Sequence, residues 1–319
     1  MKISNSITKI NSLNLEISDQ FDYKNIPIKV KNISDHIPNI KDAIGFVLGR
    51  KKDGDNLTIV SYNKEFFPYE NKLSIHIAFL NQKKSFIASS SLLYSFILIC
   101  NKMNVNDLIS RHSKQQLDSL LMLLDLNFHV VEFSKNTIPH VVIEKNFILN
   151  NNIAKEEEYI SAFKKNYSSK TINIESNQIF SQTYLNKVDS KISNSISNIN
   201  AFSRLLNIDY DKFPKTFEEL NKLCKLQNNI KGTTIGAGEK TYYFIENKNK
   251  ISVLLCPKSS KVRKLLKSVW RALNDCNSEV VFTNKHDDWI DSILFLAGFA
   301  LVSSNNQHSD SLWKWERLL

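Results

Sequence analysis

Apolar and polar residues alternate over residues 73–79 (LSIHIAF) in the pattern of a half-buried β-strand. The apolar side chains share one face of this predicted strand, and His76 lies on the other face. A polar turn over 81–85 comes next, followed by a largely apolar stretch that predicts a helix over 86–103. This order is typical of a mixed sheet with a crossover helix. The later elements of this first set are a helix over 114–124 and strands over 129–133 and 140–144.

The same order of elements recurs near the carboxyl terminus, starting from a predicted strand over 251–256. Two hairpins are predicted, because a polar turn separates 43–48 from 57–62 before the first set, and another separates 241–246 from 251–256, the strand that opens the second set. The repeat therefore predicts two related α/β units. The later elements of the second set are helices over 261–273 and 287–296 and strands over 279–283, 299–303 and 312–315.

The stretches between these sets suggest three regions. We predict an amino-terminal unit over 1–150, a helical linker region over 151–230 that packs with the second unit, and a carboxyl-terminal unit over 231–319. Residues 1–41 are polar with scattered isoleucines, so we expect a lead-in with one strand around 26–30. The glycine-rich run 232–240 precedes a strand instead of opening a helix, so it is interpreted as a flexible turn and not as a dinucleotide loop.

The composition is that of a globular protein with two cores. The chain has 319 residues, 42% of them hydrophobic and 23% charged, which is enough apolar material for two domains. No apolar run reaches the roughly 18 residues that a membrane-spanning helix needs. The four cysteines form no CxxC motif and Met1–Leu15 has no apolar leader, so we expect a cytoplasmic protein with buried free thiols and no metal.

The net charge of +10 can be explained in two ways. It could attract a polyanion such as nucleic acid, or a phosphorylated cofactor. Alternatively, the chain is rich in Lys, Asn, Ile and Ser together, as an AT-rich genome would produce, and such lysines need not gather in one patch. Nucleic acid therefore stays open as a partner.

The run Leu296-Ala297-Gly298-Phe299 marks a helix end followed by a strand, after the order strand, basic turn, helix, strand, helix. This arrangement resembles the carboxyl-terminal half of the GNAT superfamily of acyl-CoA-dependent N-acyltransferases. In the first set the corresponding place has Leu126-Asn127-Phe128, and Asn, like Gly, tolerates the left-handed conformation that ends a helix. The resemblance implies an α/β fold of two GNAT-like units, each a mixed central sheet flanked by helices.

The sequence departs from the family pattern at the positions that carry its chemistry. The family's glycine-rich phosphate loop corresponds to 83–89 here, where Ile87 and Ser89 occupy the glycine positions, and the second loop has no glycine. The family's general-acid tyrosine falls at Leu123 and Leu294. The asparagine that usually starts the same helix falls at Gln116 and Asp287.

The resemblance also indicates which residues to test. The base that deprotonates the amine would be His76 or Glu246, and Asp287 is interpreted as a helix cap with catalytic use as the alternative. Hydroxyls, amides and cations at the two helix starts would hold the phosphates of the donor. The predicted donor-binding residues are Phe79, Lys83, Lys84, Ser85 and Ser89 in the first set, and Leu255, Ser259, Ser260 and Lys261 in the second.

These observations favour an N-acyltransferase that moves an acyl group from acyl-CoA (acetyl-CoA), or a similar donor, to an amine. The alternative is a non-catalytic basic protein that keeps the fold and binds nucleic acid or a protein. A third hypothesis combines them in an acyltransferase whose acceptor is a nucleobase or tRNA. Trp313 and Trp315 alternate with Lys314, which predicts core packing, with stacking on bases as the alternative.

Overall fold

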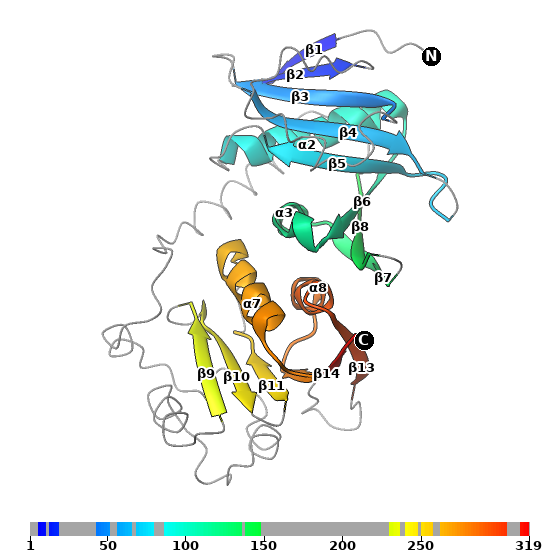
Figure 1. The fold of residues 1–319 in the computed structure, drawn as a ribbon. Coiled ribbons are helices and arrows are strands. Elements are labelled where there is room, and N and C mark those ends of the chain that lie inside the picture. The colour runs from blue at the N-terminus through cyan, green and yellow to red at the C-terminus, as the bar shows by residue number, and fades with distance from the viewer. Residues whose placement is uncertain are drawn as a thin grey trace. The chain divides into compact units, whose positions relative to one another are not determined.

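The structure is a computed structural model of the chain in which two compact units can be distinguished (Figure 1). Unit 1 contains strands β1 to β8, and unit 2 contains strands β9 to β14. The residues that the structure describes are 6–10, 13–18, 43–51, 56–65, 68–79, 86–135, 138–147, 230–236, 240–247, 250–257, 262–304 and 313–318.

Unit 1 is built on an eight-stranded sheet with the order β1-β2-β3-β4-β5-β6-β8-β7. Neighbouring strands are antiparallel except β5 and β6, which run parallel. Alternation of buried and half-buried residues along β2 shows that only one face of that strand enters the core. The strands are β1 (Ser6–Ile10), β2 (Leu13–Ser18), β3 (Gly45–Lys51), β4 (Asn56–Lys64), β5 (Leu73–Phe79), β6 (Asp107–Ser113), β7 (His129–Ser134) and β8 (His140–Asn146).

Helix α2 (Phe86–Met103) connects β5 to β6 and packs on β3 and β4. The hydroxyls of Ser91 on α2 and Thr58 on β4 are 2.7 Å apart. A Cβ atom at Gly49 would lie 1.9 Å from the Ser91 hydroxyl, so glycine permits the close approach of helix and sheet. A short 3₁₀ helix, η4 (Lys114–Gln116), leads into α3 (Leu117–Asp125).

Unit 2 is built on a six-stranded sheet with the order β13-β14-β12-β11-β10-β9, in which only β11 and β12 are parallel. Helix α7 (Arg263–Asp275) connects these two strands, and α8 (Asp288–Leu296) follows β12. The strands are β9 (Ile230–Ile235), β10 (Tyr242–Asn247), β11 (Ile251–Leu255), β12 (Val280–Thr283), β13 (Phe299–Ser304) and β14 (Trp313–Arg317).

Both units follow the same path from the parallel pair onward. In each, a helix joins the parallel strands, a second helix follows, and the last strand inserts between the two strands before it. The second helices end alike, because Asn127 (φ +62°) and Gly298 (φ +91°) both adopt the left-handed conformation. This confirms the predicted equivalence of Leu126-Asn127-Phe128 and Ala297-Gly298-Phe299.

The outer strand of each final hairpin carries an irregularity in register. In β7 it lies between Val130 and Glu132, and in β13 between Leu301 and Ser303. Large apolar side chains are exposed at both places, with Val131 40% and Leu301 40% accessible. These strands lie at the edges of their sheets, where bulges are common.

Most predicted elements of both units are confirmed, with helix 86–103 matching at both ends. The lead-in prediction is wrong in part, since β1 and β2 occupy residues 6–18. The flexible turn predicted from Gly232 is also wrong over 232–235, which belong to β9. Strand β6 was not predicted at all, because its sequence, DLISRHS, does not alternate regularly. The strand expected around 26–30 and most of the linker region lie outside the described residues, so the domain boundaries stay a prediction.

No helix in the described part of the chain is long and apolar enough to span a membrane. Cys100, Cys256 and Cys276 are buried free thiols. Burial raises the pKa of Cys100 and of Cys256 to about 12, so both stay protonated at neutral pH. The fourth cysteine, Cys224, lies outside the described residues.

Candidate functional site

The parallel strands of unit 1 separate soon after they meet. β5 and β6 pair only at Leu73 with Leu108 and at Ser74 with Ile109. One residue further, the Ser110 hydroxyl donates a hydrogen bond of 2.8 Å to the carbonyl oxygen of Ile75. A side chain thus replaces the backbone ladder at the point of divergence, and the described backbone of β5 from His76 onward has no ladder partner on β6.

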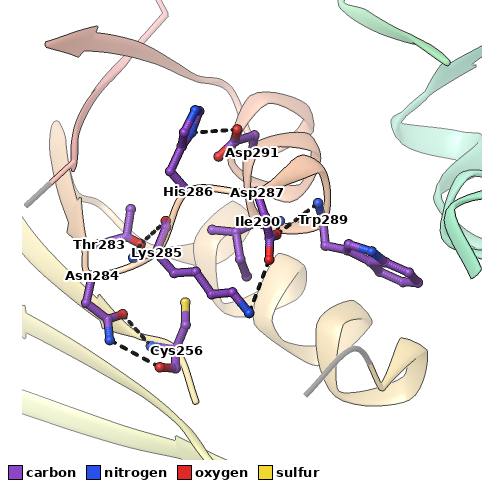
Figure 2. A network of polar contacts seen from close by, with 9 residues as sticks. All are labelled: Cys256, Thr283, Asn284, Lys285, His286, Asp287, Trp289, Ile290 and Asp291. Carbon is purple, nitrogen blue, oxygen red and sulfur yellow. Dashed lines mark hydrogen bonds and ion pairs between the residues drawn. The ribbon is translucent and has the colours of Figure 1, made fainter. Parts of the chain in front are cut away.

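The parallel strands of unit 2 stay together. β11 and β12 pair over four residues, from Ile251 with Val280 to Leu254 with Thr283. Beyond the last pair, the Asn284 side chain accepts a 2.8 Å hydrogen bond from the Cys256 amide and donates one of 3.1 Å to the Cys256 carbonyl (Figure 2). The carboxyl ends of β11 and β12 are therefore joined by a side-chain amide.

His76 lies on the face of β5 opposite α2, as its place in the alternation predicted. Its neighbours Ile75 and Ile77 are buried on the other face, and Ser61 on β4 is its register partner. Burial, followed by the positive charge of Arg111, lowers the pKa of His76, while the carboxylate of Glu65 opposes the shift. The imidazole is therefore neutral at physiological pH and can accept a proton.

Arg111 on β6 is fixed by a two-point contact with Glu65 at the end of β4. Its Nη2 lies 2.9 Å from Glu65 Oε2, and its Nη1 donates to the other carboxylate oxygen. The guanidinium also lies over the Tyr69 ring, 5.7 Å from the centroid. A positive guanidinium and a negative carboxylate therefore lie beside His76 in fixed positions.

A second polar group extends this cluster through the loop before β5. The Tyr69 hydroxyl donates a 2.9 Å hydrogen bond to Glu132 on β7, and Lys72 forms an ion pair with Glu144 on β8. Burial and the neighbouring Glu132 raise the pKa of Tyr69, so the phenol stays protonated. The loop, β6, β7 and β8 together place three carboxylates, each already paired, near the amino end of the parallel pair.

His112, two residues after Ser110 on β6, is fully enclosed. It is 3% exposed, and neither ring nitrogen makes a hydrogen bond of normal geometry among the described residues. Burial, with a smaller effect of His76, lowers the pKa of His112 to about 3, and the backbone of Gln116 opposes that shift weakly. The ring is therefore neutral.

The residues at the starts of the second helices occupy cap positions. Gln116 is the N-cap of α3, and its side chain accepts from the Ser113 amide at 3.2 Å. Asp287 is the N-cap of α8, where one carboxylate oxygen accepts from the amides of Trp289 and Ile290 at 3.1 and 3.0 Å. Its other oxygen lies 3.1 Å from Lys285 Nζ. Helix capping and the ion pair with Lys285 account for these contacts of Asp287.

His286 and Asp291 form a dyad beside this cap (Figure 2). His286 Nδ1 lies 2.7 Å from Asp291 Oδ2, and the imidazole stacks on Trp313 with a centroid distance of 4.1 Å. The Asp291 side chain is 6% exposed and that of His286 39%. Burial raises the pKa of Asp291 to about 7, although His286 opposes the shift. Trp315, two residues from Trp313, is buried, so core packing is confirmed for that residue.

Three of the predicted donor-binding residues lie in the described part of the chain. Phe79 ends β5, and Leu255 ends β11 and is buried. Ser89 is buried on α2, and its hydroxyl contacts the Met122 sulfur of α3 at 3.5 Å. The remaining residues, Lys83, Lys84, Ser85, Ser259, Ser260 and Lys261, lie outside the described residues.

The two predicted bases, His76 and Glu246, belong to different units. Glu246 lies on β10 of unit 2, opposite Lys231 of β9, and its carboxylate is 3.5 Å from the Lys231 ammonium. Leu123 and Leu294, at the family's tyrosine positions, are both fully buried. Within the described ranges, no three His, Cys, Asp or Glu side chains are grouped so that they could hold a metal ion.

Sequence reasoning missed Arg111, His112 and Ser110 because it missed β6. The repeat itself held a usable signal. The second set has a strand between its two helices, so the first set required one between residues 103 and 114. The His286–Asp291 dyad was also missed, since the run around Asp287 indicates only a helix cap with an acidic first turn.

Two features define the class of fold. The sheet is mixed and has one parallel pair of strands, and the last strand inserts between the two strands that precede it in the chain. Both units have the GNAT-like arrangement, a mixed central sheet flanked by helices, that the order of elements predicted. No family model and no curated protein matches the chain.

Solved structures similar to the chain include acetyltransferases. One is a ribosomal-protein-S5-alanine acetyltransferase from Vibrio fischeri, with 11% identity over 44% of this chain and 96% of that one and a TM-score of 0.35. An uncharacterized protein from Bacillus halodurans shares 12% over 52% and 99%, with a TM-score of 0.36. A GNAT superfamily phosphinothricin acetyltransferase from Sinorhizobium meliloti, in complex with AcCoA, shares 13% over 32% and 60%, with a TM-score of 0.28.

Proposed function

We propose that this protein is an N-acyltransferase that takes an acyl group from acyl-CoA, or a similar thioester donor, and transfers it to an amine, with the donor in unit 1. The observation that carries the proposal is the early separation of β5 and β6, which pair over two residues where β11 and β12 pair over four. In the family that the chain resembles, the pantetheine arm of the donor lies between splayed central strands. Unit 1 has this feature, and unit 2 has the Asn284 amide in its place.

The backbone of β5 beyond Ser74 would bind the donor. Its amide and carbonyl groups on the β6 side are not used by a ladder, and a pantetheine arm offers amide groups that pair with such an edge. The basic turn Lys83-Lys84-Ser85, which precedes α2 in the sequence, would bind the phosphates.

His76 would act as the general base in the acyl transfer. A neutral imidazole takes the proton that the neutral amine loses as the nitrogen lone pair adds to the thioester carbonyl carbon. The tetrahedral intermediate collapses by breaking the carbon–sulfur bond, which leaves an amide and a CoA thiolate. The proton held on His76 can neutralise that thiolate directly or through water, so the cycle needs no acid at the Leu123 position.

A second candidate function concerns unit 2. Its carboxyl-terminal strand ends are joined by Asn284, and α7 carries four basic residues near one another along its length, Arg263, Lys264, Lys267 and Arg271. Lys264 and Arg271 are exposed. We propose that unit 2 is a binding module for an anionic macromolecule, in the first place nucleic acid, which would make a nucleobase or tRNA a natural acceptor for unit 1.

Calorimetric titration of the whole chain with acetyl-CoA tests the first proposal. We expect binding to one site per chain, and a rise in melting temperature at millimolar ligand by mass action. Absence of both effects would remove the acyl-CoA proposal. A gel shift with RNA and DNA tests the second. Affinity should fall steeply with salt and should weaken when Lys264 and Arg271 are changed to Ala; no shift even at low salt would exclude nucleic acid as the partner.

A further inference from the structure

His286 and Trp313 form an aromatic pair at the surface of unit 2. The imidazole stacks on the indole with a centroid distance of 4.1 Å and an interplanar angle of 28°, and the His286 side chain is 39% exposed. Trp313 is half-buried, whereas Trp315, two residues further along β14, belongs to the core. Core packing therefore explains Trp315 and leaves the partly exposed pair of rings unexplained.

Asp291 fixes the imidazole from a second side. Its Oδ2 lies 2.7 Å from His286 Nδ1, and only 6% of the Asp291 side chain is exposed (Figure 2). The other oxygen, Oδ1, is buried and has no hydrogen-bond partner in the described part of the chain. A buried carboxylate with an unsatisfied oxygen costs stability. An arrangement that is unfavourable for folding and that fixes one partly exposed ring points to a function of that ring.

The aromatic pair lies at the end of the sheet where α7 begins. β11 and β12 are parallel, α7 follows β11, and the turn with His286 follows β12. The two hydrogen bonds between Cys256 and Asn284 show that these strand ends are adjacent. The first two turns of α7 carry three basic residues, which are Arg263, Lys264 and Lys267. A cationic helix start and a stack of two rings therefore lie at the same end of the sheet.

The acidic residues of the turn do not give this end of the sheet a negative charge. Asp287 lies 3.1 Å from Lys285 Nζ, and Asp291 pairs with His286. Asp288 is the third acidic residue, in the first turn of α8. Lys285 and the three basic residues of α7 outnumber these three acids, so a polyanion can approach.

A histidine paired with a carboxylate can also serve as the general base for a nearby nucleophile. The Cys256 thiol lies within electrostatic reach of Asp291, but it is 3% exposed. Burial raises the pKa of Cys256 to about 12, which keeps the thiol protonated. This thiol therefore cannot act as the nucleophile, and binding explains the exposed imidazole better than catalysis does.

We infer that His286 and Trp313 form a stacking platform that binds a base of single-stranded nucleic acid on the outer face of the imidazole. This inference rests on the second proposed function, in which unit 2 binds nucleic acid, and it names the form of nucleic acid that unit 2 recognises. Histidine and tryptophan rings stack on unpaired bases, whereas the bases of a duplex are already stacked on one another. Because Trp313 and Asp291 hold the ring in place, binding costs little additional side-chain entropy. The cations of α7 would contact the phosphates.

The test uses an RNA of about twelve nucleotides and mixed sequence, added to the full chain as a single strand or as a duplex with its complement. We expect the single strand to bind more tightly. The ring proton signals of His286, identified by their loss in His286→Asn, should move upfield when the single strand is added, because a stacked base shields them. The duplex should leave these signals in place.

Affinities from fluorescence anisotropy provide the second readout. His286→Asn should bind the single strand about tenfold more weakly, because stacking on one base is lost while the Asn amide can still donate to Asp291. This loss should be the same at low and high salt, whereas the loss caused by Lys264→Ala should shrink as salt rises. Trp313→Leu should also weaken binding, since the imidazole loses its support. His129→Asn, at an exposed position of unit 1, is the control and should keep full affinity.

The possible results separate the platform from the function on which it rests. If neither form of the RNA binds at low salt, the second proposed function fails and the platform fails with it. If RNA binds while the His286 signals stay in place and His286→Asn keeps full affinity, only the platform is wrong, and other residues of unit 2 bind the nucleic acid. Should His286→Asn not fold, the spectra of the unaltered chain decide, because the contact with the Trp313 ring also identifies His286.

Discussion

The side-chain amide of Asn284 is hydrogen-bonded to both the amide nitrogen and the carbonyl oxygen of Cys256, at 2.8 and 3.1 Å. This pair continues the contact between β11 and β12 beyond the last residue of their ladder. In the described part of unit 1, a hydrogen bond from the Ser110 hydroxyl to the Ile75 carbonyl connects the comparable strands after their ladder. The two parallel strands therefore separate in unit 1 and stay joined in unit 2. This difference allows the two units to be tested separately.

Replacing Asn284 should destabilise unit 2 without changing the binding of the donor. Asn284→Ala leaves the Cys256 amide and carbonyl without these partners, which costs about 1–3 kcal/mol in the free energy of unfolding. Asn284→Asp is the matched control, because it keeps the acceptor and loses the donor. Denaturant unfolding followed for each variant measures the cost. A loss of acetyl-CoA binding in Asn284→Ala would place the donor in unit 2 and contradict our assignment.

Replacing His76 should abolish turnover and spare donor binding. Loss of a general base lowers kcat by about 10²–10⁴-fold, so His76→Gln should show this decrease with an unchanged Kd for acetyl-CoA. The thiol released from the donor reports the rate with any amine found to be an acceptor. His129→Gln, at an exposed position of β7, is the control and should keep full activity. Unchanged turnover in His76→Gln, with Glu246→Gln inactive, would move the chemistry to unit 2.

The pH profile should respond to Glu65. The pKa of His76 is lowered, and above this pKa the imidazole is unprotonated and can act as the base. Activity should therefore fall only on the acid side of the pH profile. Glu65 raises the pKa of His76 and compensates Arg111, so Glu65→Gln should move the acid limb of kcat/KM further toward low pH. A rate profile from pH 4 to 9 measures the shift. Movement of the limb toward higher pH would show that Arg111 does not act on His76 as the structure indicates.

The stability of unit 2 should depend on pH through Asp291. Its pKa is about 7 in the folded chain, above the ordinary value of 3.8, so the folded state binds this proton more tightly than the unfolded state. The stabilisation is fully present below about pH 4 and is lost as pH rises toward 7, with a slope of at most about 1.4 kcal/mol per pH unit. Asp291→Asn should flatten this part of the curve. Equal slopes in both proteins would mean that Asp291 ionises normally.

The two helix ends should respond differently to alanine and glycine. Gly298 has a φ of +91° and no atom lies within 4 Å of the place that a Cβ would occupy, so Gly298→Ala meets backbone strain alone, of about 1–2 kcal/mol. Asn127→Gly, at a φ of +62°, should change stability by only a few tenths of a kcal/mol, since both residues accept this conformation. Thermal unfolding compares them; equal effects would show that left-handed geometry is not the deciding factor.

Periodicity predicted the elements that sit in strongly alternating or strongly apolar sequence, such as β5 and α2. It failed at β6, where Asp107, Arg111 and the two serines interrupt the apolar pattern. Ser110 bonds to the Ile75 carbonyl where the strands diverge, and Arg111 pairs with Glu65. The helix ends could be predicted from residue type, since Asn127 and Gly298 are the residues that tolerate a positive φ.

The candidate site was harder to predict, because its contacts join residues far apart in the chain. His76 could be placed on the correct face from alternation alone. Arg111 and Glu65 are 46 positions apart in the sequence, and Cys256 and Asn284 are 28 positions apart. No local sequence pattern encodes either contact. The role of Asp287 as a helix cap could be predicted from its position before an apolar run. The contact between His286 and Asp291 could not, because the first turn of α8 brings the two side chains together.

The irregular outer strands β7 and β13 have a consequence for how the chain behaves at high concentration. In the described structure each lies at the edge of its sheet and carries exposed apolar side chains such as Val131 and Leu301, which is the kind of surface that recruits another strand. The break in register at Val130–Glu132 and at Leu301–Ser303 interrupts the even spacing that a docking strand would need. A regular edge at either place would favour filaments of linked chains, so we expect these two irregularities in register to work against self-association.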